Sequence, residues 1–518
     1  MDTKALRQKI LDLAIRGKLV PQDPNDEPAS VLLERIRQQK QQMVKEGKLK
    51  PKDIKKDSVI FVGEDNLHYE KFADGSVKCI EDEIPFDLPE GWAWARLNQI
   101  YNFIDYRGAT PNKISSGVPL ITAKNVKSGY IDYTIDEYIS EEEYWDRQQR
   151  GTSRLGDVLF TTEAPLGNAA IADIEKFSAG QRLITFQHYG SCVLNNHTFL
   201  YFILSDFFQD QLHTRKTGST VAGIKASILK TLLLPIPPIA EQDKIGEKCE
   251  NLLALIEEIT NSKQSIISAI PKTKAKILDL AIRGKLVPQD PNDEPASVLL
   301  ERIRAEKEEL IKQGKIKRDK KESVIFRGED NSYYEKMGDK VENISDEIPF
   351  ELPDGWFFVR LKELWELISG RDLSPSEYNA DGVGIPYITG ASNFVDGKVE
   401  LARWTTSPQV ITEAGDLLLT CKGTIGGMAF NDFGNAHIAR QIMAIRNTFA
   451  LNSEYLALCM RFYINAIKDA AKGLIPGISR EDILNLILPV PSPNYQAKIV
   501  ERVAEVTNII SAIEKSLS

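Results

Sequence analysis

The chain has 518 residues, of which 42% are hydrophobic and 27% are charged, a balance typical of globular proteins. Its net charge of −9 argues against a protein that holds polyanions over its whole surface. No apolar run approaches the roughly 18–20 residues that span a bilayer, and the scattered cysteines and histidines predict neither a disulfide framework nor a zinc site. No signal peptide opens the sequence, so the cytoplasm is the expected compartment.

The first two predicted helices belong to a segment that the chain carries twice. Residues 3–16 have apolar positions at helical spacing, and a second helix is predicted over 29–46 after a proline-rich loop. The 29 residues from 9 to 37 return without a change at 276–304, 267 positions later. A period near half of the chain predicts a two-unit protein rather than a solenoid of short repeats.

A basic tract, KLKPKDIKKD, follows the second helix at 48–57. It leads to SVIF at 58–61, a run that predicts a short strand. Clusters of lysine are most often solvated surface, and contact with phosphates is the alternative that this tract leaves open.

Two comparable globular regions follow, each opened by the same proline-rich turn. The first reads EIPFDLPEGWAWARL from Glu83 and extends over about 92–236, and the second reads EIPFELPDGWFFVRL from Glu347 and extends over about 356–491. Because the two regions resemble each other less than their flanks do, we expect them to carry two different specificities. Free drift of two old duplicates is the alternative.

Each region alternates short strand-like runs with turns. Examples are VPLITAKNV at 118–126 and GDVLFTT at 156–162 in the first region, and GIPYITGASNF at 384–394 and GDLLLTC at 415–421 in the second. These runs predict a mixed α+β fold with a twisted sheet in each region.

Each region closes on a proline-rich step, LPIPPIAEQ at 234–242 and LPVPSPNYQ at 488–496, and a long helix is predicted after each step. If unbroken, the first helix at 241–284 would span about 66 Å, although Pro271 predicts a kink or a brief break. Its positions alternate by four and three, as in a heptad seam. The seam consists of Ile245, Cys249, Leu252, Ile256, Ile259, Lys263, Ile266, Ile270, Thr273, Ile277 and Leu280.

The C-terminal helix repeats only the first part of this seam. Its seam positions are Ile499, Val503, Val506, Ile510, Ile513 and Leu517. The second part, KILDLAIRGKL, stands at the N-terminus instead, as in a circularly permuted pair. We therefore expect the two terminal helices to stack end to end and to pack antiparallel against 241–284, because a short helix such as 3–16 is marginal alone.

The predicted protein is an α+β protein with approximate two-fold symmetry, in which two mixed domains are joined by two long antiparallel helices that form a coiled-coil spacer. Two different readers at a set separation suit a bipartite DNA site, since half-site spacing is a geometric quantity. The predicted divisions are an arm at 1–85, a domain at 86–238, a spacer helix at 239–285, a second arm at 286–349, a second domain at 350–492 and a final helix at 493–518.

In this arrangement the sequence resembles the DNA specificity subunits of type I restriction-modification systems. The resemblance rests on motifs that recur in the same order in both halves and cover essentially the whole chain. They are LPEGW at Leu88–Trp92 and LPDGW at Leu352–Trp356, PLITAKNV and PYITGASN, GDVLF and GDLLL, LPIPPIAEQ, and the two ILDLAIRGKLVPQDP helix ends.

The resemblance implies a non-catalytic protein with two target-recognition domains, each of which reads half of a split DNA sequence. It also implies that the shared helices set the distance between the domains and bind methyltransferase subunits, two being expected, with restriction subunits as further partners. No cofactor is expected in this chain, because S-adenosylmethionine, ATP and magnesium belong to the partner subunits. The arm before the first domain and the altered closing segment at 488–496 depart from the family pattern.

The two domains are not basic overall. Residues 92–236 contain 14 Lys+Arg against 14 Asp+Glu, and residues 356–491 contain 12 against 14. DNA binding must then use a segregated face or depend on phosphate contacts from a partner subunit.

Candidate DNA contacts are residues that suit base edges or phosphates and stand in predicted loops or beside strands. In the first domain these are Arg107, Lys124, Asn125, Gln181, Arg182, Arg215, Lys216, Ser219, Thr220 and Lys225. In the second domain they are Arg371, Thr389, Ser392, Asn393, Lys422, Arg440, Gln441, Ser479 and Arg480. For each of them a solvated charge or a turn role is the alternative, and for Arg182 and Arg440 a buried ion pair is a further one.

The sequence contains no recognisable catalytic motif. It lacks a GxxxxGK[ST] phosphate loop, a dinucleotide fingerprint and the Asn-Pro-Pro-aromatic motif of adenine methyltransferases. Cys421 beside Lys422 is interpreted as a strand residue. Two other functions stay open: a symmetric protein-interaction scaffold that binds no DNA, and a stand-alone nuclease with an unrecognised site.

Overall fold

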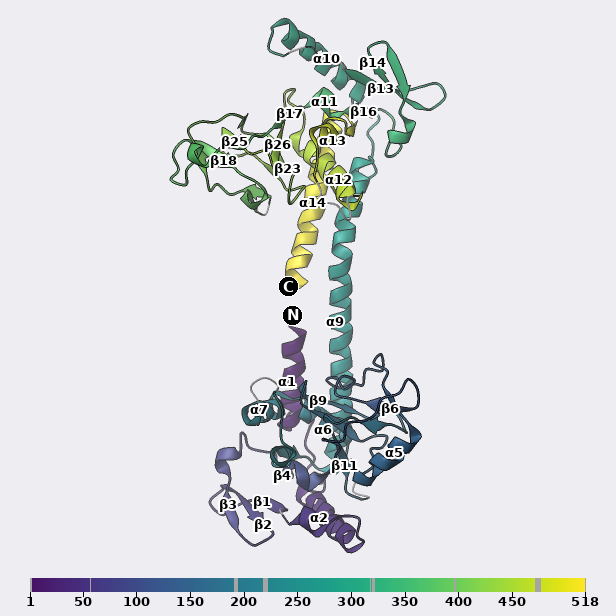
Figure 1. Cartoon of the computed structure of the whole chain (residues 1–518), viewed down its shortest axis with the longest axis vertical. Helices are drawn as coiled ribbons and strands as arrows, with labels where there is room; N and C mark the ends of the chain where they lie inside the picture. The colour runs from purple at the N-terminus through teal and green to yellow at the C-terminus, as the bar shows by residue number, and fades with distance from the viewer. Residues whose placement is uncertain are drawn as a thin grey trace. The chain divides into compact units, whose positions relative to one another are not determined.

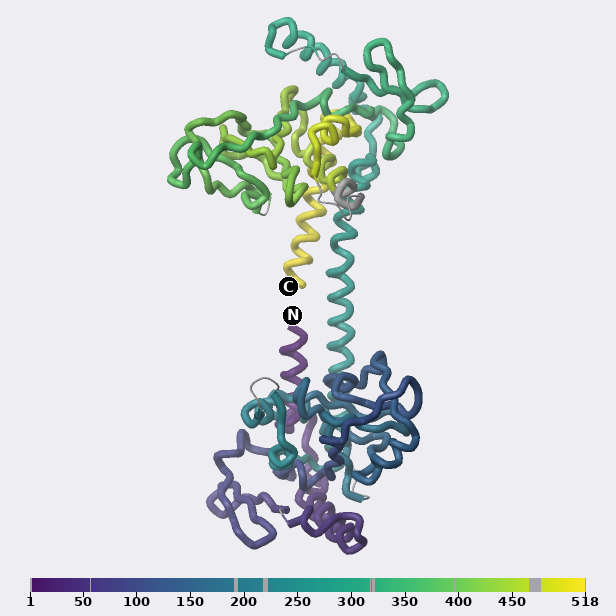
Figure 2. Tube along the Cα trace, viewed as in Figure 1, coloured from purple at the N-terminus to yellow at the C-terminus, as the bar shows by residue number. Residues whose placement is uncertain are grey.

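A computed structural model describes residues 2–55, 57–190, 194–217, 222–316, 318, 322–395, 397–470 and 477–517 (Figures 1 and 2). It divides into two compact units, Met1–Lys263 and Gln264–Ser518, and each unit contains one copy of the repeated segment. None of the helices in the described part of the chain combines the length and hydropathy that crossing a bilayer requires.

The arm of the first unit is a helical segment followed by a small antiparallel sheet. Its helices are α1 (Thr3–Ile15), α2 (Ala29–Lys45) and α3 (Pro51–Ile54), and its strands are β1 (Ser58–Val62), β2 (His68–Phe72) and β3 (Val77–Cys79). The strands pair in the order β1-β2-β3. The predicted helices and the SVIF strand are thus present, whereas β2 and β3 were not predicted, and α3 lies inside the basic tract.

The first domain is built on a four-stranded antiparallel sheet in the order β5-β11-β8-β9. Its helices are α4 (Leu97–Ile100), α5 (Glu141–Arg147), α6 (Asn196–Ile203), α7 (Asp206–Arg215) and α8 (Ala226–Leu229). Its strands are β4 (Ala93–Arg96), β5 (Tyr101–Asp105), β6 (Val118–Ile121), β7 (Tyr138–Ile139), β8 (Val158–Thr162), β9 (Leu166–Ile171), β10 (Ser178–Ala179), β11 (Leu183–His188) and β12 (Leu233–Ile236).

A separate pair of strands holds the beginning and the end of the first domain together. The opening strand β4 runs antiparallel to the closing strand β12, and the long helix α9 (Ile239–Ile282) begins just after β12. The second unit repeats this device with β16 (Phe357–Arg360), β27 (Ile487–Val490) and the final helix α14 (Pro493–Leu517). Each proline-rich step therefore connects the closing strand of a domain to a long helix, and a long helix after each step is what the sequence predicts.

The second unit repeats the arm and the domain with a different set of short strands. Its arm contains α10 (Ala296–Lys312), β13 (Ser323–Arg327), β14 (Tyr333–Met337) and β15 (Lys340–Asn343). The main sheet has the order β17-β26-β23-β24, and a second sheet has the order β21-β18-β25-β22. The remaining elements are α11 (Leu361–Leu364), β17 (Glu366–Ser369), β18 (Ile385–Ile388), β19 (Phe394–Val395), β20 (Lys398–Val399), β21 (Trp404–Thr405), β22 (Ile411–Thr412), β23 (Leu417–Thr420), β24 (Met428–Phe430), β25 (Ala436–Ile438), β26 (Ile442–Arg446), α12 (Ser453–Ala470) and α13 (Arg480–Leu484).

The helix α9 is continuous through Pro271, so the predicted break is absent. Within the first unit, α1 lies beside the first part of α9 and runs in the opposite direction (Figure 1). Ile10 and Ile15 of α1 share a hydrophobic core there with Ile245 and Cys249 of α9. Within the second unit, α14 packs with the last part of α9, and Lys274 pairs with Glu514 at 2.8 Å.

The predicted seam is buried where α9 and α14 cross the core of a unit and also at Ile270 and Ile510, which lie outside those cores. Ile245 is fully buried, whereas Ile259 and Ile266 are 40% and 44% exposed, and Ile513 of α14 is also exposed. A heptad position is hidden only where another element covers it. End-to-end stacking of the two terminal helices stays a prediction.

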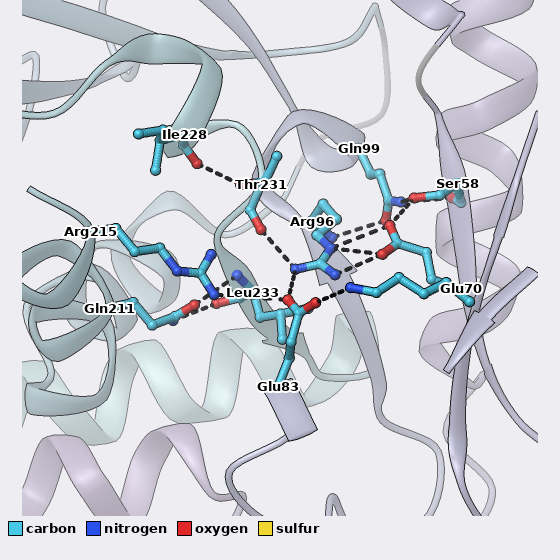
Figure 3. A network of polar contacts seen from close by, with 11 residues as sticks. Ser58, Glu70, Glu83, Arg96, Gln99, Gln211, Arg215, Ile228, Thr231 and Leu233 are labelled. Atoms are coloured by element: carbon cyan, nitrogen blue, oxygen red, sulfur yellow. Dashed lines mark hydrogen bonds and ion pairs between the residues drawn. The ribbon is translucent and has the colours of Figure 1, made fainter. Parts of the chain in front are cut away.

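Buried charges attach each arm to its domain. In the first unit Arg96 of β4 donates to Glu70 of β2 at 2.6 Å and to Glu83 at 2.8 Å, with its side chain nearly inaccessible (Figure 3). Arg360 makes the corresponding contacts with Glu335 and Glu347 in the second unit, at 2.7 and 2.8 Å. Each arm is therefore part of the same folded body as the domain that follows it.

Candidate nucleic-acid interface

Loops from three strands of the first main sheet gather at one edge. Strand β11 runs antiparallel to both β5 and β8, with Ile184 opposite Asp105 and Leu183 opposite Thr161. Strands β5 and β8 therefore end where β11 begins. We name this place the first loop edge and define it as residues 106–112, 163–165, 180–182 and 222–225.

Candidate residues of the first domain meet at this edge. The guanidinium of Arg107 donates to Asp105 at 2.6–3.1 Å and to the carbonyl of Ile224 at 3.3 Å. The hydrogen bond that Arg107 donates to Asp105 raises the pKa of Arg107, so its positive charge is secured. Nearby, Thr110 donates to the Oε1 atom of Gln181 at 2.9 Å. Arginine and glutamine side chains that are far apart along the chain thus lie at the same edge.

The second main sheet builds an equivalent edge from different residues. Strand β26 runs antiparallel to β17 and β23, with Met443 opposite Ser369 and Ile442 opposite Thr420. The second loop edge is defined as residues 370–373, 421–424, 439–441 and 477–480. It brings together the candidates Arg371, Lys422, Arg440, Gln441, Ser479 and Arg480.

Two of the candidate arginines form ion pairs at the surface. Arg182 pairs with Glu163 at 3.1 Å, and Arg440 pairs with Asp372 at 2.7 Å, with the arginine side chains 50% and 67% exposed. The alternative of a buried ion pair is therefore wrong for both. Because exposed pairs contribute little stability, each guanidinium can exchange its carboxylate for a DNA group at small cost.

The two candidate asparagines have a different role from the predicted one. Asn125 and Asn393 are 1% and 4% exposed. The carbonyl group of Asn125 accepts from Thr122, and its amide group donates to the carbonyls of Asp132 and Ile135. Asn393 accepts in the same way from Thr389 and donates to the carbonyl of Glu400. Because both groups are engaged and buried, each asparagine braces a loop and has no free group to offer a base.

The other candidates divide between exposed and structural positions. Lys124, Lys216, Lys225 and Ser392 are exposed. Arg215 lies 3.8 Å from Glu83 and is drawn toward the arm. Ser479 caps α13 by accepting from the amide of Asp482, and Arg480 donates to the carbonyl of Leu367 at 2.6 Å. Ser219 and Thr220 lie outside the described residues.

One exposed arginine of this region was not predicted. Arg150 donates to the carbonyl of Arg107 at 3.0 Å and so lies directly beside the first loop edge. The neighbouring Arg147 is buried, and it donates to Ser178 and to the carbonyls of Ala109 and Ala179. Both stand in the mixed-charge segment EEEYWDRQQR, where local sequence does not tell an exposed arginine from a structural one.

The groups gathered at the two loop edges are of the kinds that contact nucleic acids. Among the described residues, no cluster of histidine, cysteine and carboxylate side chains is arranged to hold a metal ion. Burial raises the pKa of the Cys421 thiol, which disfavours the nucleophilic thiolate. Cys421 stands directly after β23 and not within it, so its interpretation as a strand residue is wrong by one position. Beside the carboxylates of Glu163 and Asp372, the loop edges present cations and amides, the groups that contact phosphates and base edges.

One protein family is matched by the comparisons with known sequences. The model of the type I restriction modification DNA specificity domain matches residues 89–268 and 353–518, more than half of the chain. The specificity subunits of the type I restriction enzymes EcoEI and EcoAI, both from Escherichia coli, are each 27% identical to this chain. The alignments cover 99% and 97% of this chain and 90% and 88% of the two relatives.

Solved structures support the same fold. A crystal structure of the HsdS subunit from Thermoanaerobacter tengcongensis matches with a TM-score of 0.51 and 20% identity, covering 84% of this chain and 94% of the other. A structure described as the structural basis of complex assembly and conformational transition of the type I R-M system matches with a TM-score of 0.50 and 19% identity. At these identities the likeness concerns the fold alone.

Proposed function

The chain belongs to the family of type I restriction-modification DNA specificity subunits, and from this premise we propose that its two domains read the two halves of a bipartite DNA target. The first loop edge contacts one half-site, and the second loop edge contacts the other. Arg107, Arg182 and Gln181 are the leading base or phosphate contacts in the first domain. Arg371, Arg440 and Gln441 have this role in the second.

One observation carries the proposal: the two units place different side chains at equivalent edges of equivalent sheets. The pair Gln181–Arg182 precedes β11, and the pair Arg440–Gln441 precedes β26 at the corresponding place with the order reversed. The frames around these edges are repeated, down to the buried arginine networks. A repeated frame with unlike contact residues suits a protein that reads two unlike half-sites.

Methyltransferase subunits, and restriction subunits where the system has them, are the proposed protein partners. The apolar residues Leu255, Ile259, Ile266 and Ile267 lie exposed along the middle of α9, and Ile509 and Ile513 lie exposed on α14. Exposed apolar side chains that follow one another along a helix are typical of a protein interface. We propose that S-adenosylmethionine, ATP and magnesium bind to these partners and that this chain performs no catalysis itself.

Co-expression with the methyltransferase subunit, followed by methylation mapping of the host DNA, tests the proposal. We expect a split motif with methyladenine on both strands. A complex without a methylated motif would remove the reader role and leave the scaffold function. Cleavage of DNA by the isolated chain with a divalent metal would support the nuclease instead.

A further inference from the structure

A large groove lies in the first unit between the arm and the first recognition domain. Its volume is about 1540 Å³. Lys50, Lys52 and Lys55, on and beside α3, line the arm side. Arg150 and Lys230 line the domain side. We call this space the arm groove.

The carboxylates of the arm groove are already engaged. All five accept hydrogen bonds from the protein itself: Asp53, Glu70, Asp74, Glu83 and Asp105. Arg96 donates to Glu70 and Glu83, and Arg107 donates to Asp105. Asp53 and Asp74 accept from backbone amides in local turns. The negative charges of Glu70, Glu83 and Asp105 are therefore compensated by arginines before any ligand arrives, whereas Asp53 and Asp74 keep their charge and are held by neutral donors.

Several cations of the groove lack such partners. Lys50, Lys52 and Lys55 are exposed, and none of them forms an ion pair within the described part of the chain. In the part of the chain that the structure describes, Arg150 donates to a neutral carbonyl, that of Arg107, and forms no ion pair, so no carboxylate there compensates its charge. The groove thus presents positive charge on both walls although the whole chain carries a net charge of −9.

The arm groove is continuous with the first loop edge. Strand β5 contributes Asn102, Phe103 and Asp105 to the groove, and the chain then turns into the loop of Arg107. Arg150 links the two places, because it lines the groove and bonds to the carbonyl of Arg107. A DNA strand that leaves the loop edge on this side would place its phosphates against the lysines.

The second arm differs in charge at the corresponding place. The identity of the two repeats ends at Arg37 and Arg304, and Glu306, Glu308 and Glu309 then stand where the first arm has glutamines. Glu308 holds Arg318 through two contacts of 2.6 and 2.7 Å. The first arm is therefore the more basic, and its lysines have fewer competing carboxylates.

We propose that the arm groove binds the sugar-phosphate backbone of the DNA that flanks the first half-site, so that the arm adds affinity without sequence preference. This inference rests on the proposed function. It identifies the arm as a DNA-contacting element next to the recognition domain and resolves the open interpretation of the basic tract in favour of phosphate contact.

The test measures binding of the complete complex with its methyltransferase subunits to duplexes with and without the methylated motif, over a range of salt concentrations. The variant is Lys50→Glu/Lys52→Glu/Lys55→Glu. Loss of three phosphate contacts is expected to reduce the slope of log K against log salt by about 2.7. Affinity should fall by the same factor on both duplexes, and the methylated motif should not change.

A matched variant in the second arm, Lys312→Glu/Lys315→Glu/Lys336→Glu, changes the net charge equally and should leave the slope unaltered. Equal effects of the two variants, or no effect of the first, would overturn the groove proposal while the motif still supports the reader function. Loss of complex assembly in the first variant alone would assign the groove to an acidic protein partner. Wild-type binding without preference for the motif would instead defeat the reader function, and the slopes would still test the groove.

Discussion

Asp157 and Asp416 occupy the same place in the two units, since each stands between a glycine and the first residue of a strand, β8 or β23. Their hydrogen-bond partners differ. Asp157 is buried and accepts from the amide of Arg154 and from the neutral side chain of Gln187, both at 2.8 Å. Asp416 accepts from Arg446 at 3.0 Å. Burial raises the pKa of Asp157 from 3.8 to about 6, because the lost hydration outweighs the two hydrogen bonds and the charge of Arg154, which lower it.

This shift predicts a pH-dependent stability of the first unit. A carboxyl whose folded pKa lies above its unfolded pKa stabilises the fold when protonated, and that contribution is lost as pH rises from about 4 to about 6. Asp157→Asn removes the ionisation. We expect the variant to gain about 2 kcal/mol of unfolding free energy relative to wild type between pH 4 and pH 7. Urea denaturation of both chains across this range measures the difference.

Gln187→Arg provides the matching change in the opposite direction, since it copies the pairing of Asp416 with Arg446. It should lower the pKa of Asp157 and weaken the fall in stability between pH 4 and pH 6. If Asp157→Asn and wild type keep a constant difference over the whole range, Asp157 does not titrate there and the burial argument is wrong.

The residue scale also shows where sequence reasoning stops. Arg107, Gln181 and Arg182 were predicted from residue type beside strand-like runs, and the fold brings them together. Asn125 also has a suitable residue type beside a strand-like run, but the fold buries it. Arg150 lies in a segment of mixed charge that gave no such indication, and the fold exposes it next to Arg107. Exposure depends on tertiary packing, which neighbouring letters do not encode.

At the scale of elements, the arm hairpins depend on their buried arginines. Replacing Arg96 with Met would leave the buried Glu70 without its cation between β2 and β4, whereas Glu83 would keep Lys78 at 3.0 Å. Removal of one partner from a buried pair generally costs about 3–5 kcal/mol. We expect Arg96→Met to lower the unfolding free energy of the first unit by this amount and to open the arm to limited proteolysis.

Arg35→Met is the control for that variant, because Arg35 and its partner Glu27 are both about half exposed. An exposed pair contributes at most about 1 kcal/mol. A loss of similar size in the two variants would mean that the arm is held by its hydrophobic contacts and that the arginine network is dispensable.

The helix α9 offers a second element-scale test at Pro271. A proline inside a helix lacks the amide that would bond to the carbonyl four residues earlier, and it costs about 3 kcal/mol relative to alanine. Since α9 continues through this position, Pro271→Ala should raise the unfolding free energy of the second unit by up to that amount. The corresponding position of the first repeat is Lys4, so the repeated frame already accepts another residue there.

Calorimetry of the complete chain measures this change. Pro271→Gly is the control, because glycine restores the amide but adds flexibility, so its gain should be smaller by about 1 kcal/mol. Destabilisation by Pro271→Ala would indicate that the proline ring makes a packing contact that the helix needs.

Elements with strong local periodicity were predictable, and those fixed by pairing were not. The helices α1 and α2 follow from apolar spacing and proline-rich stops. The hairpin of β2 and β3 did not follow, because its strands are short and largely exposed. Asp74–Gly75 was the available signal, since this dipeptide favours hairpin turns and Gly75 adopts a φ of +86°. The predicted break at Pro271 is absent, because the proline removes one amide donor while the helical hydrogen bonds continue on both sides of it.

At the scale of the whole molecule, the two copies share one structural frame but differ in the loops proposed to contact DNA. The 29-residue identity, the paired opening and closing strands and the buried arginine networks recur, whereas the loops at the two edges differ. A frame that is copied twice allows one edge to change while the other keeps its target. Each half of the DNA motif should then depend on residues of one domain only.

This dependence is testable with two double variants, Gln181→Ala/Arg182→Ala and Arg440→Ala/Gln441→Ala. A good bidentate contact to a base contributes about 1–3 kcal/mol of discrimination, so each variant should relax or shift one half of the methylated motif by about tenfold or more. Arg302→Ala, at an exposed arginine of α10 paired with Glu294, should leave both halves intact. Methylation mapping in cells that express the complete complex reads out both halves at once. If both double variants altered the same half, or if each altered both halves, the two edges would act jointly and the assignment of one domain to one half-site would be wrong. If each variant altered a different half, the two halves of the target would be read by separate surfaces of one repeated frame, and each surface could change without the other.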